Sequence, residues 1–150
     1  MTDAIIPPKA AAWIKDHAQR YLATDGADGH IITPPGQDRP VPTLLLTTVG
    51  RKSGQHLLMP LIYGKNGDDH IIIASRGGAP EHPSWYLNLV DTPEVEVQVL
   101  ADKFKARART AHGAERQKLW DMMAEMCPFY RRYQETAGDR EIPVIVLERM

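Results

Sequence analysis

Two adjacent cations, Arg51 and Lys52, lie in a turn whose residue types suit the binding of an anion. The turn, 50–55, has a glycine near each end and joins the apolar runs 44–49 and 57–63, which predicts the tip of a β-hairpin. No Asp or Glu occurs between residues 43 and 63. Because no acid nearby in the sequence offsets the two positive charges, the field at this tip should favour an anion.

A second strand end repeats this chemistry. The run 70–75 is followed by Arg76, Gly77 and Gly78. Glycine has no Cβ and readily adopts positive φ, so backbone N–H groups there can come close to a phosphate or to a ring edge. An exposed turn with solvated charges would explain the first cluster alone. The repetition at an independent strand end favours a flat, anionic ligand instead.

The strands that must position these turns read as mostly antiparallel hairpins. Residues 94–99 alternate strictly, which predicts a strand with one buried face, and 104–110 are its expected partner across a turn at 101–103. Residues 142–147 form the last expected strand. This gives about six strands without the regular alternation of a doubly wound sheet. We expect a mainly β (α+β) fold, a small split β-barrel.

Two or three helices are expected to flank this barrel. Pro83 can precede a short helix over 84–90. Residues 114–126 have helical periodicity, with a stripe of Leu119, Met122, Met123 and Met126. Pro128 ends or kinks that helix, and 129–134 resume as another turn.

The N-terminal region, 1–23, is expected to hold a helix over 8–23, followed by a long Gly- and Pro-rich loop or arm over 24–42. The apolar positions of the helix are Trp13, Ile14, His17, Ala18, Tyr21 and Leu22. Two interpretations stay open. The helix packs on the domain, or it lies on a membrane surface, where Trp13 and Tyr21 would suit the interface.

The composition predicts one domain, 1–150, in the cytoplasm. With 150 residues and 43% hydrophobic content, the chain can bury a core of its own. No apolar run is long enough to span a bilayer and no secretion signal is visible, so we expect at most peripheral contact with the inner face of the membrane. A net charge of -1 argues against nucleic acid as the main partner.

The usual fingerprints of metal and nucleotide sites are missing from the sequence. Cys127 is the only cysteine, which excludes an internal disulfide, and the six histidines lack paired metal-ligand spacing, so we expect no metal. Neither GxGxxG after a strand nor GxxxxGK[ST] occurs.

Five short motifs in order resemble those of the deazaflavin-dependent nitroreductase family, in the flavin and deazaflavin oxidoreductase superfamily (group A). They are TVGRKSG (48–54), MPL (59–61), ASRGG (74–78), PSWYLNL (83–89) and PEV (93–95). The resemblance runs from about residue 44 to the C-terminus. It implies a split β-barrel that uses coenzyme F420, an 8-hydroxy-5-deazaflavin with a phosphate and an oligoglutamate tail. The implied reaction is hydride transfer from the reduced cofactor to activated double bonds, quinones or nitroaromatic compounds.

The residues of these motifs suit both parts of such a cofactor. Clustered cations and free backbone amides are what a phosphate and carboxylates require, and an apolar slot with a few polar groups is what the ring requires. The expected tail-binding residues are Arg51, Lys52, Ser53, Gly54, Arg76, Gly77 and Gly78. The expected ring-binding residues are Met59, Pro60, Ala74, Ser75, Trp85, Tyr86 and Asn88.

Tyr130, Tyr133 and Ser75 are the expected catalytic residues. The two tyrosines lie three apart after Pro128, so in a helix they share a face, and matching positions in the family bear tyrosines that line the substrate site. The hypothesis is that Tyr130 donates a hydrogen bond to the oxygen that becomes negative, while Tyr133 forms a wall. Alternatively, the two tyrosines are half-buried packing residues whose hydroxyls reach water, and solvent supplies the proton.

Two departures from the family pattern leave the natural substrate open. Leu57 stands where members often carry an arginine three residues before Pro60, which weakens the expected grip on the tail. Cys127 stands where a menaquinone-reducing relative has a tyrosine.

Two rival functions stay open as well. One is an FMN-dependent oxidoreductase of the same fold, and the other is a non-catalytic F420 carrier or storage protein. The expected partner is a small electrophilic substrate, and the oligomeric state is open, with a monomer as one option.

Overall fold

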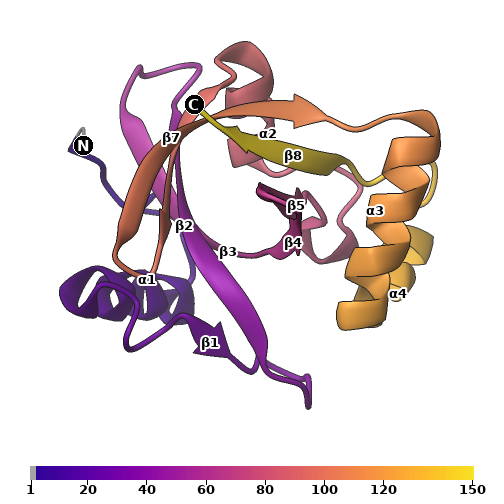
Figure 1. The fold of residues 1–150 in the computed structure, drawn as a ribbon, viewed down its shortest axis with the longest axis horizontal. Helices are drawn as coiled ribbons and strands as arrows, with labels where there is room; N and C mark the ends of the chain where they lie inside the picture. Colours follow the sequence, from indigo (N-terminus) through magenta and orange to yellow (C-terminus); the bar gives the residue numbers. More distant parts are fainter. Residues whose placement is uncertain (1–2) are drawn as a thin grey trace.

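The computed structural model describes residues 3–150 and shows a split β-barrel built from one antiparallel sheet (Figure 1). Within these residues the sheet has eight strands in the order β1-β2-β6-β7-β8-β5-β4, and β3 pairs with β2 beside this path. The predicted fold class is confirmed, but about six strands was too few, because β1 and β4 are too short to leave a periodic pattern. The strands are β1 Ile31–Ile32, β2 Val41–Val49, β3 His56–Ile62, β4 Gly64–Asn66, β5 Asp69–Ile73, β6 Glu94–Val99, β7 Asp102–Thr110 and β8 Val144–Arg149.

Strand β2 is the centre of the half of the sheet that carries the Arg51 turn. It pairs with β3 from Thr43 opposite Ile62 to Val49 opposite His56, so the predicted hairpin is confirmed and the turn 50–55 projects from two fully paired strands. On its other edge β2 pairs with β6. Because most of β2 is buried on both faces, the turn stands on a rigid base.

Strand β6 is buried on both faces, so the prediction of a single buried face was wrong. Glu96 is 9% exposed and Gln98 only 6%, although both occupy the polar positions of the alternating pattern. The end of α1 (Ala12–Thr24) covers this side: Gln98 Nε2 donates to the Leu100 carbonyl at 2.9 Å and to Asp25 Oδ1 at 3.3 Å. At Gln98 the alternating pattern therefore marked a polar side chain that is hydrogen-bonded at the end of a helix, and not a solvated face.

Helix α1 starts later and faces differently than predicted. Its buried residues are His17, Ala18 and Tyr21, whereas Trp13 and Leu22 are 51% and 44% exposed. The Tyr21 hydroxyl donates to the Thr43 carbonyl at 3.0 Å, which fastens the helix to β2. The packed-helix interpretation therefore describes the middle of α1, and its two apolar ends remain in contact with solvent.

Four α-helices surround the sheet within the described part of the chain, one more than the largest number predicted. Besides α1 they are α2 Ser84–Asp91, α3 Gly113–Met126 and α4 Phe129–Thr136. The break between α3 and α4 falls at Cys127 and Pro128, as the proline predicts. Leu119 and Met123 of the predicted stripe are fully buried.

Figure 1 shows α1 and the α3–α4 pair on opposite sides of the molecule, with the strands between them. One cluster of core residues packs β5 and β8 against α3 and α4, and another packs β6 and β7 against α2. Among residues 3–150 no helix is long and apolar enough to cross a membrane.

Candidate functional site

A cavity of about 940 Å³ lies between these helices, and four parts of the fold form its walls. They are the β2–β3 hairpin, the segment 75–77 with the start of α2, helix α4, and α1 together with the segments on either side of it. Among the residues that line these walls are Pro7, Pro8, Trp13, Ile14, His17, Ser53, Leu57, Met59, Pro60, Ser75, Arg76, Gly77, Trp85, Asn88, Tyr130 and Tyr133.

The turn 50–55 is fastened to α2 by one buried amide. The Asn88 Oδ1 accepts from the Arg51 backbone N–H at 3.2 Å and from Arg51 Nη1 at 2.9 Å, and Asn88 Nδ2 donates to Thr48 Oγ1 at 3.3 Å. Asn88 is only 2% exposed, while the side chain of Lys52 is free in solvent. Two of these three contacts orient Arg51, and Asn88 also lines the cavity, so its predicted contact with a ligand stays a prediction.

The segment after β5 has a backbone suited to an anion. Ser75 is in the right-handed helical region, and Arg76, Gly77 and Gly78 follow with φ of 48°, 62° and 82°. A change from right- to left-handed conformation makes successive N–H groups point to one side and form an anion-binding concavity. The Arg76 guanidinium has only a 3.5 Å contact with Glu81, and both side chains are more than half exposed, so its charge is largely available.

Gly78 has a different role from its neighbours. A Cβ at this position would lie 2.8 Å from the Tyr133 carbonyl oxygen and 3.0 Å from the Tyr133 Cα. Gly78 therefore lets the segment pack directly on α4, and it does not line the cavity.

The predicted cofactor residues separate into two groups. The structure brings eight of them to the cavity: Ser53, Met59, Pro60, Ser75, Arg76, Gly77, Trp85 and Asn88. The others lie beside or behind it: Arg51, Lys52, Gly54, Ala74, Gly78 and Tyr86. Ala74 is buried at the strand end, and the Tyr86 hydroxyl hydrogen-bonds with Thr110 Oγ1 at 3.0 Å, so it is engaged by β7.

The two tyrosines of α4 both line the cavity but differ in their surroundings. Tyr130 is 3% exposed and is buried in the same core cluster as Cys127. Burial raises the pKa of Tyr130 well above its ordinary value, with Cys127 and Tyr133 adding to the effect, and burial raises the pKa of Cys127 to about 11. Tyr133 is only partly buried, and within residues 3–150 its hydroxyl has no hydrogen-bond partner.

Sequence reasoning missed one wall of the cavity, which α1 and its flanking segments form. Pro7, Pro8, Trp13 and Ile14 line it from the helix side, and Ile32, Pro34 and Pro35 line it from the arm. The amphipathic pattern of α1 showed an apolar face but could not tell a wall from a packing surface. The prolines of the arm were the available signal, since their rings are apolar and their missing N–H groups disfavour regular strand pairing.

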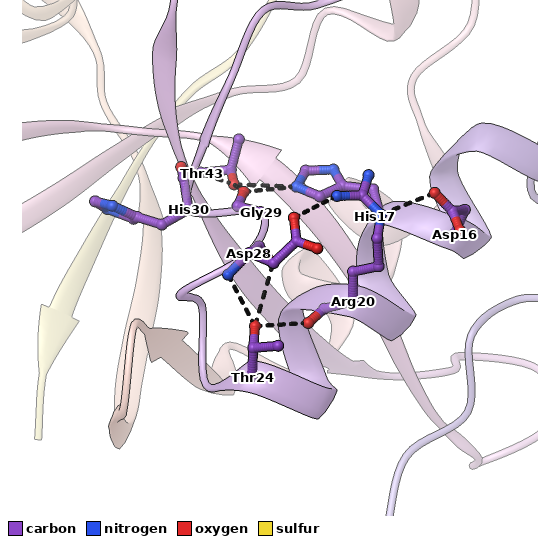
Figure 2. Close-up of polar contacts among 8 residues, drawn as sticks. All are labelled: Asp16, His17, Arg20, Thr24, Asp28, Gly29, His30 and Thr43. Atoms are coloured by element: carbon purple, nitrogen blue, oxygen red, sulfur yellow. Dashed lines mark hydrogen bonds and ion pairs between the residues drawn. The ribbon is translucent and has the colours of Figure 1, made fainter.

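Hydrogen bonds hold this wall in place (Figure 2). His17 Nε2 donates to the Gly29 carbonyl at 2.8 Å, and Thr43 Oγ1 donates to the same oxygen at 2.7 Å. Arg20 bridges Asp16 of its own helix, at 2.9 Å, and Asp28 of the arm, at 2.6 Å. The start of the arm is thereby tied to both α1 and β2.

Comparisons with known proteins identify the family of this chain. Residues 13–149 match the model of the F420H2-dependent quinone reductase family. An F420H2-dependent quinone reductase of Mycobacterium tuberculosis is 38% identical over 136 residues, which cover 89% of this chain and 87% of that protein.

Two solved structures are similar to this chain in both fold and sequence. A structure of an F420H2-dependent reductase superposes with a TM-score of 0.66 at 36% identity, covering 79% of this chain and 98% of that one. Another, described as a domain-swapped dimer, has a TM-score of 0.68 at 35% identity and covers 91% and 97% of the two chains. The chain belongs to the F420H2-dependent quinone reductase family.

Proposed function

We propose that this chain transfers a hydride from reduced F420 to a quinone, and that the cavity between α1, α2 and α4 is where both bind. The observation that carries the proposal is the division of the cavity wall. One part of the wall presents Arg76 and the segment 75–77, and the part formed by α1 and its flanking segments is mostly apolar, with Lys9 and His17 as its polar members. That division matches a cofactor with an anionic tail and a flat ring beside an apolar substrate.

The residues present fit such a cofactor. The phosphate and carboxylates of F420 would be held by Arg51, Lys52, Arg76 and the N–H groups of 75–77, because charge-assisted hydrogen bonds to anions are the strong ones. The ring would lie against Met59, Pro60 and Trp85, which line the cavity beside Ser75. Leu57 lines it too and gives that part of the wall no charge.

When bound, reduced F420 supplies the hydride, and the chain supplies position and a proton donor. Tyr133 is the better placed donor, because its side chain is only partly buried whereas Tyr130 is almost fully buried beside Cys127. A hydrogen bond from Tyr133 to the quinone oxygen would strengthen as that oxygen gains negative charge. Tyr130 would then be a wall residue, which exchanges the roles that the sequence suggested.

The apolar wall supports the choice of a quinone among the electrophiles that the resemblance allows. Pro7, Pro8, Trp13 and Ile14 would contact an apolar side chain on the quinone, whereas a compact nitroaromatic would leave this surface uncovered. The exposed large apolar side chains of residues 3–150 are scattered over several segments, with Trp13 and Leu22 at opposite ends of α1. We therefore expect no more than weak contact with a membrane surface, which liposome pelleting at physiological salt would measure.

Steady-state assays with reduced F420 and a panel of acceptors test the proposal. The panel should pair quinones with and without an apolar side chain and include enones and nitroaromatics. We expect the absorbance of oxidised F420 to reappear with quinones, with the lower KM for those that carry the side chain. If the protein binds reduced F420 but does not oxidise it, whichever acceptor is added, it is a carrier. If its absorption spectrum changes only when FMN is added, it is a flavoprotein.

Oligomeric state is a separate question for the same preparation. One related structure is described as a domain-swapped dimer, which weakens the expectation of a monomer. Light scattering of the purified protein would measure its mass in solution.

A further inference from the structure

Arg140 lies in the connection between α4 and β8, behind the segment that forms the anion-binding backbone. Its guanidinium contacts three carbonyl oxygens of this segment. Nη1 donates to Ala74 at 3.0 Å, Nη2 donates to Ser75 at 2.7 Å, and Nε and Nη2 donate to Ala79 at 3.0 and 2.7 Å. Nη1 also donates to His82 Nδ1 at 3.2 Å. One side chain thereby holds both ends of the turn.

These contacts determine where the neighbouring N–H groups point. In a trans peptide the C=O and N–H bonds are coplanar and point in opposite directions, and no cis peptide bond occurs among residues 3–150. The Ala74 carbonyl shares its peptide with the Ser75 N–H, and the Ser75 carbonyl shares its peptide with the Arg76 N–H. Because Arg140 draws both carbonyls toward itself, both N–H groups must point away from it.

Arg140 does not itself line the cavity, whereas Ser75, Arg76 and Gly77 do. It is also fixed to α4: Gln134 Nε2 donates to the Arg140 carbonyl at 2.7 Å, and Gln134 Oε1 accepts from the Ile142 N–H at 2.9 Å. The chain of contacts therefore runs from the helix that carries Tyr133, through Arg140, to the segment 74–79.

We propose that Arg140 is a positioning residue, which presents the N–H groups of Ser75 and Arg76 to the anionic part of the cofactor without touching it. This inference rests on the proposed function for the identity of the anion. Arginine is required because its planar fork reaches carbonyls on both sides of the turn, and a lysine ammonium keeps the charge but cannot span them. Left-handed conformation at Arg76 is unfavourable for a residue with a Cβ, so without the fork the turn should relax.

The test compares Arg140→Lys with a matched control, Arg116→Lys. Arg116 holds the same connection, through a 2.7 Å bond from Nη2 to the Ile142 carbonyl and an ion pair with Glu141, but it has no bond to the segment 74–79. The affinity of each variant for oxidised F420 is measured by titration, and hydrogen–deuterium exchange of the segment 74–82 is measured without cofactor. Thermal unfolding reports any general loss of stability.

We expect Arg140→Lys to weaken F420 binding about tenfold or more, the scale of one lost charge-assisted hydrogen bond. Exchange should become faster in 74–82 only, KM for reduced F420 should rise with little change in kcat, and Arg116→Lys should keep wild-type affinity. Added guanidinium should partly restore affinity to Arg140→Ala.

Wild-type affinity in Arg140→Lys with unchanged exchange in 74–82 would overturn the proposal, as would faster exchange across the whole protein in step with the control. If the wild-type protein failed to bind F420, the proposed function would fall. The exchange experiment would still decide whether Arg140 orders the turn.

Discussion

Acidification should destabilise this fold through His70, a buried histidine of β5. The centroid of its ring lies 5.4 Å from the ring centroids of both Tyr63 and Phe104, and the residue is 8% exposed. Within residues 3–150 its Nδ1 has no hydrogen-bond partner. Burial, helped by the positive charges of Lys65 and Arg149 and opposed by Asp102, lowers the pKa of His70 from 6.5 to about 4.

The sign follows from which state binds the proton. Between pH 6.5 and about 4 the unfolded chain takes up a proton at His70 that the folded chain does not. The stabilising contribution is therefore complete above pH 6.5 and is lost as the pH falls toward 4. At about 1.4 kcal/mol for each pH unit, the loss amounts to as much as roughly 3 kcal/mol of the free energy of unfolding.

The assay is urea unfolding at a series of pH values between 7 and 4 for the wild-type protein and for His70→Leu. Other groups change protonation in this range, including His30 and His82, whose pKa values burial also lowers, so the difference between the two proteins is the informative quantity. We expect the variant to lose less stability on acidification, by about 2–3 kcal/mol. A surface control, His112→Gln, should follow the wild type. Parallel pH profiles for the wild type and His70→Leu would show that His70 does not cause the loss of stability on acidification.

The remaining predictions concern the cavity. Replacing Arg51 and Lys52 together by Ala should raise the Kd for F420 about tenfold or more, and added salt should weaken wild-type binding, whereas unchanged affinity with the fold intact would remove these cations from the tail site. Tyr133→Phe should lower kcat about 10- to 1000-fold with little change in cofactor affinity, while Tyr130→Phe should lower kcat far less; the reverse order in one quinone assay would return the donor role to Tyr130. Gly78→Ala should lower the free energy of unfolding by about 2–4 kcal/mol, because residue 78 has a left-handed backbone conformation and the added Cβ would collide with α4. The same change at the preceding glycine, which faces open space, should cost only about 1 kcal/mol.

Local patterns predicted the parts of the fold that local physics determines. The Arg51 hairpin was visible because glycines near both ends of 50–55 separate two apolar runs, and the structure pairs these runs as expected. The helix after Pro83 and the break at Pro128 were visible because proline restricts the backbone in the same way in any fold.

Contacts between distant residues left no such pattern. Arg140 lies 65 residues from Ser75, and a single arginine in a connecting segment carries no periodic signal. Gln98 is buried where it meets the end of α1, which is far away in the sequence, and Glu96 is buried too, so alternation misrepresented β6 as half solvated. The sequence likewise placed two tyrosines on one face of a helix, but could not show that Tyr130 is almost fully buried whereas Tyr133 is only partly buried.

A single-turnover experiment measures directly whether the protein passes a hydride from reduced F420 to a quinone. Enzyme in excess is mixed with reduced F420, and then with a quinone that carries an apolar side chain, while the absorbance of oxidised F420 is followed. We expect rapid oxidation of one equivalent of F420 that depends on the quinone. The oxidation should be much slower in Tyr133→Phe, and in the double variant of Arg51 and Lys52 it should weaken at low cofactor concentration. Tight binding of reduced F420 with no oxidation by any quinone would contradict this expectation.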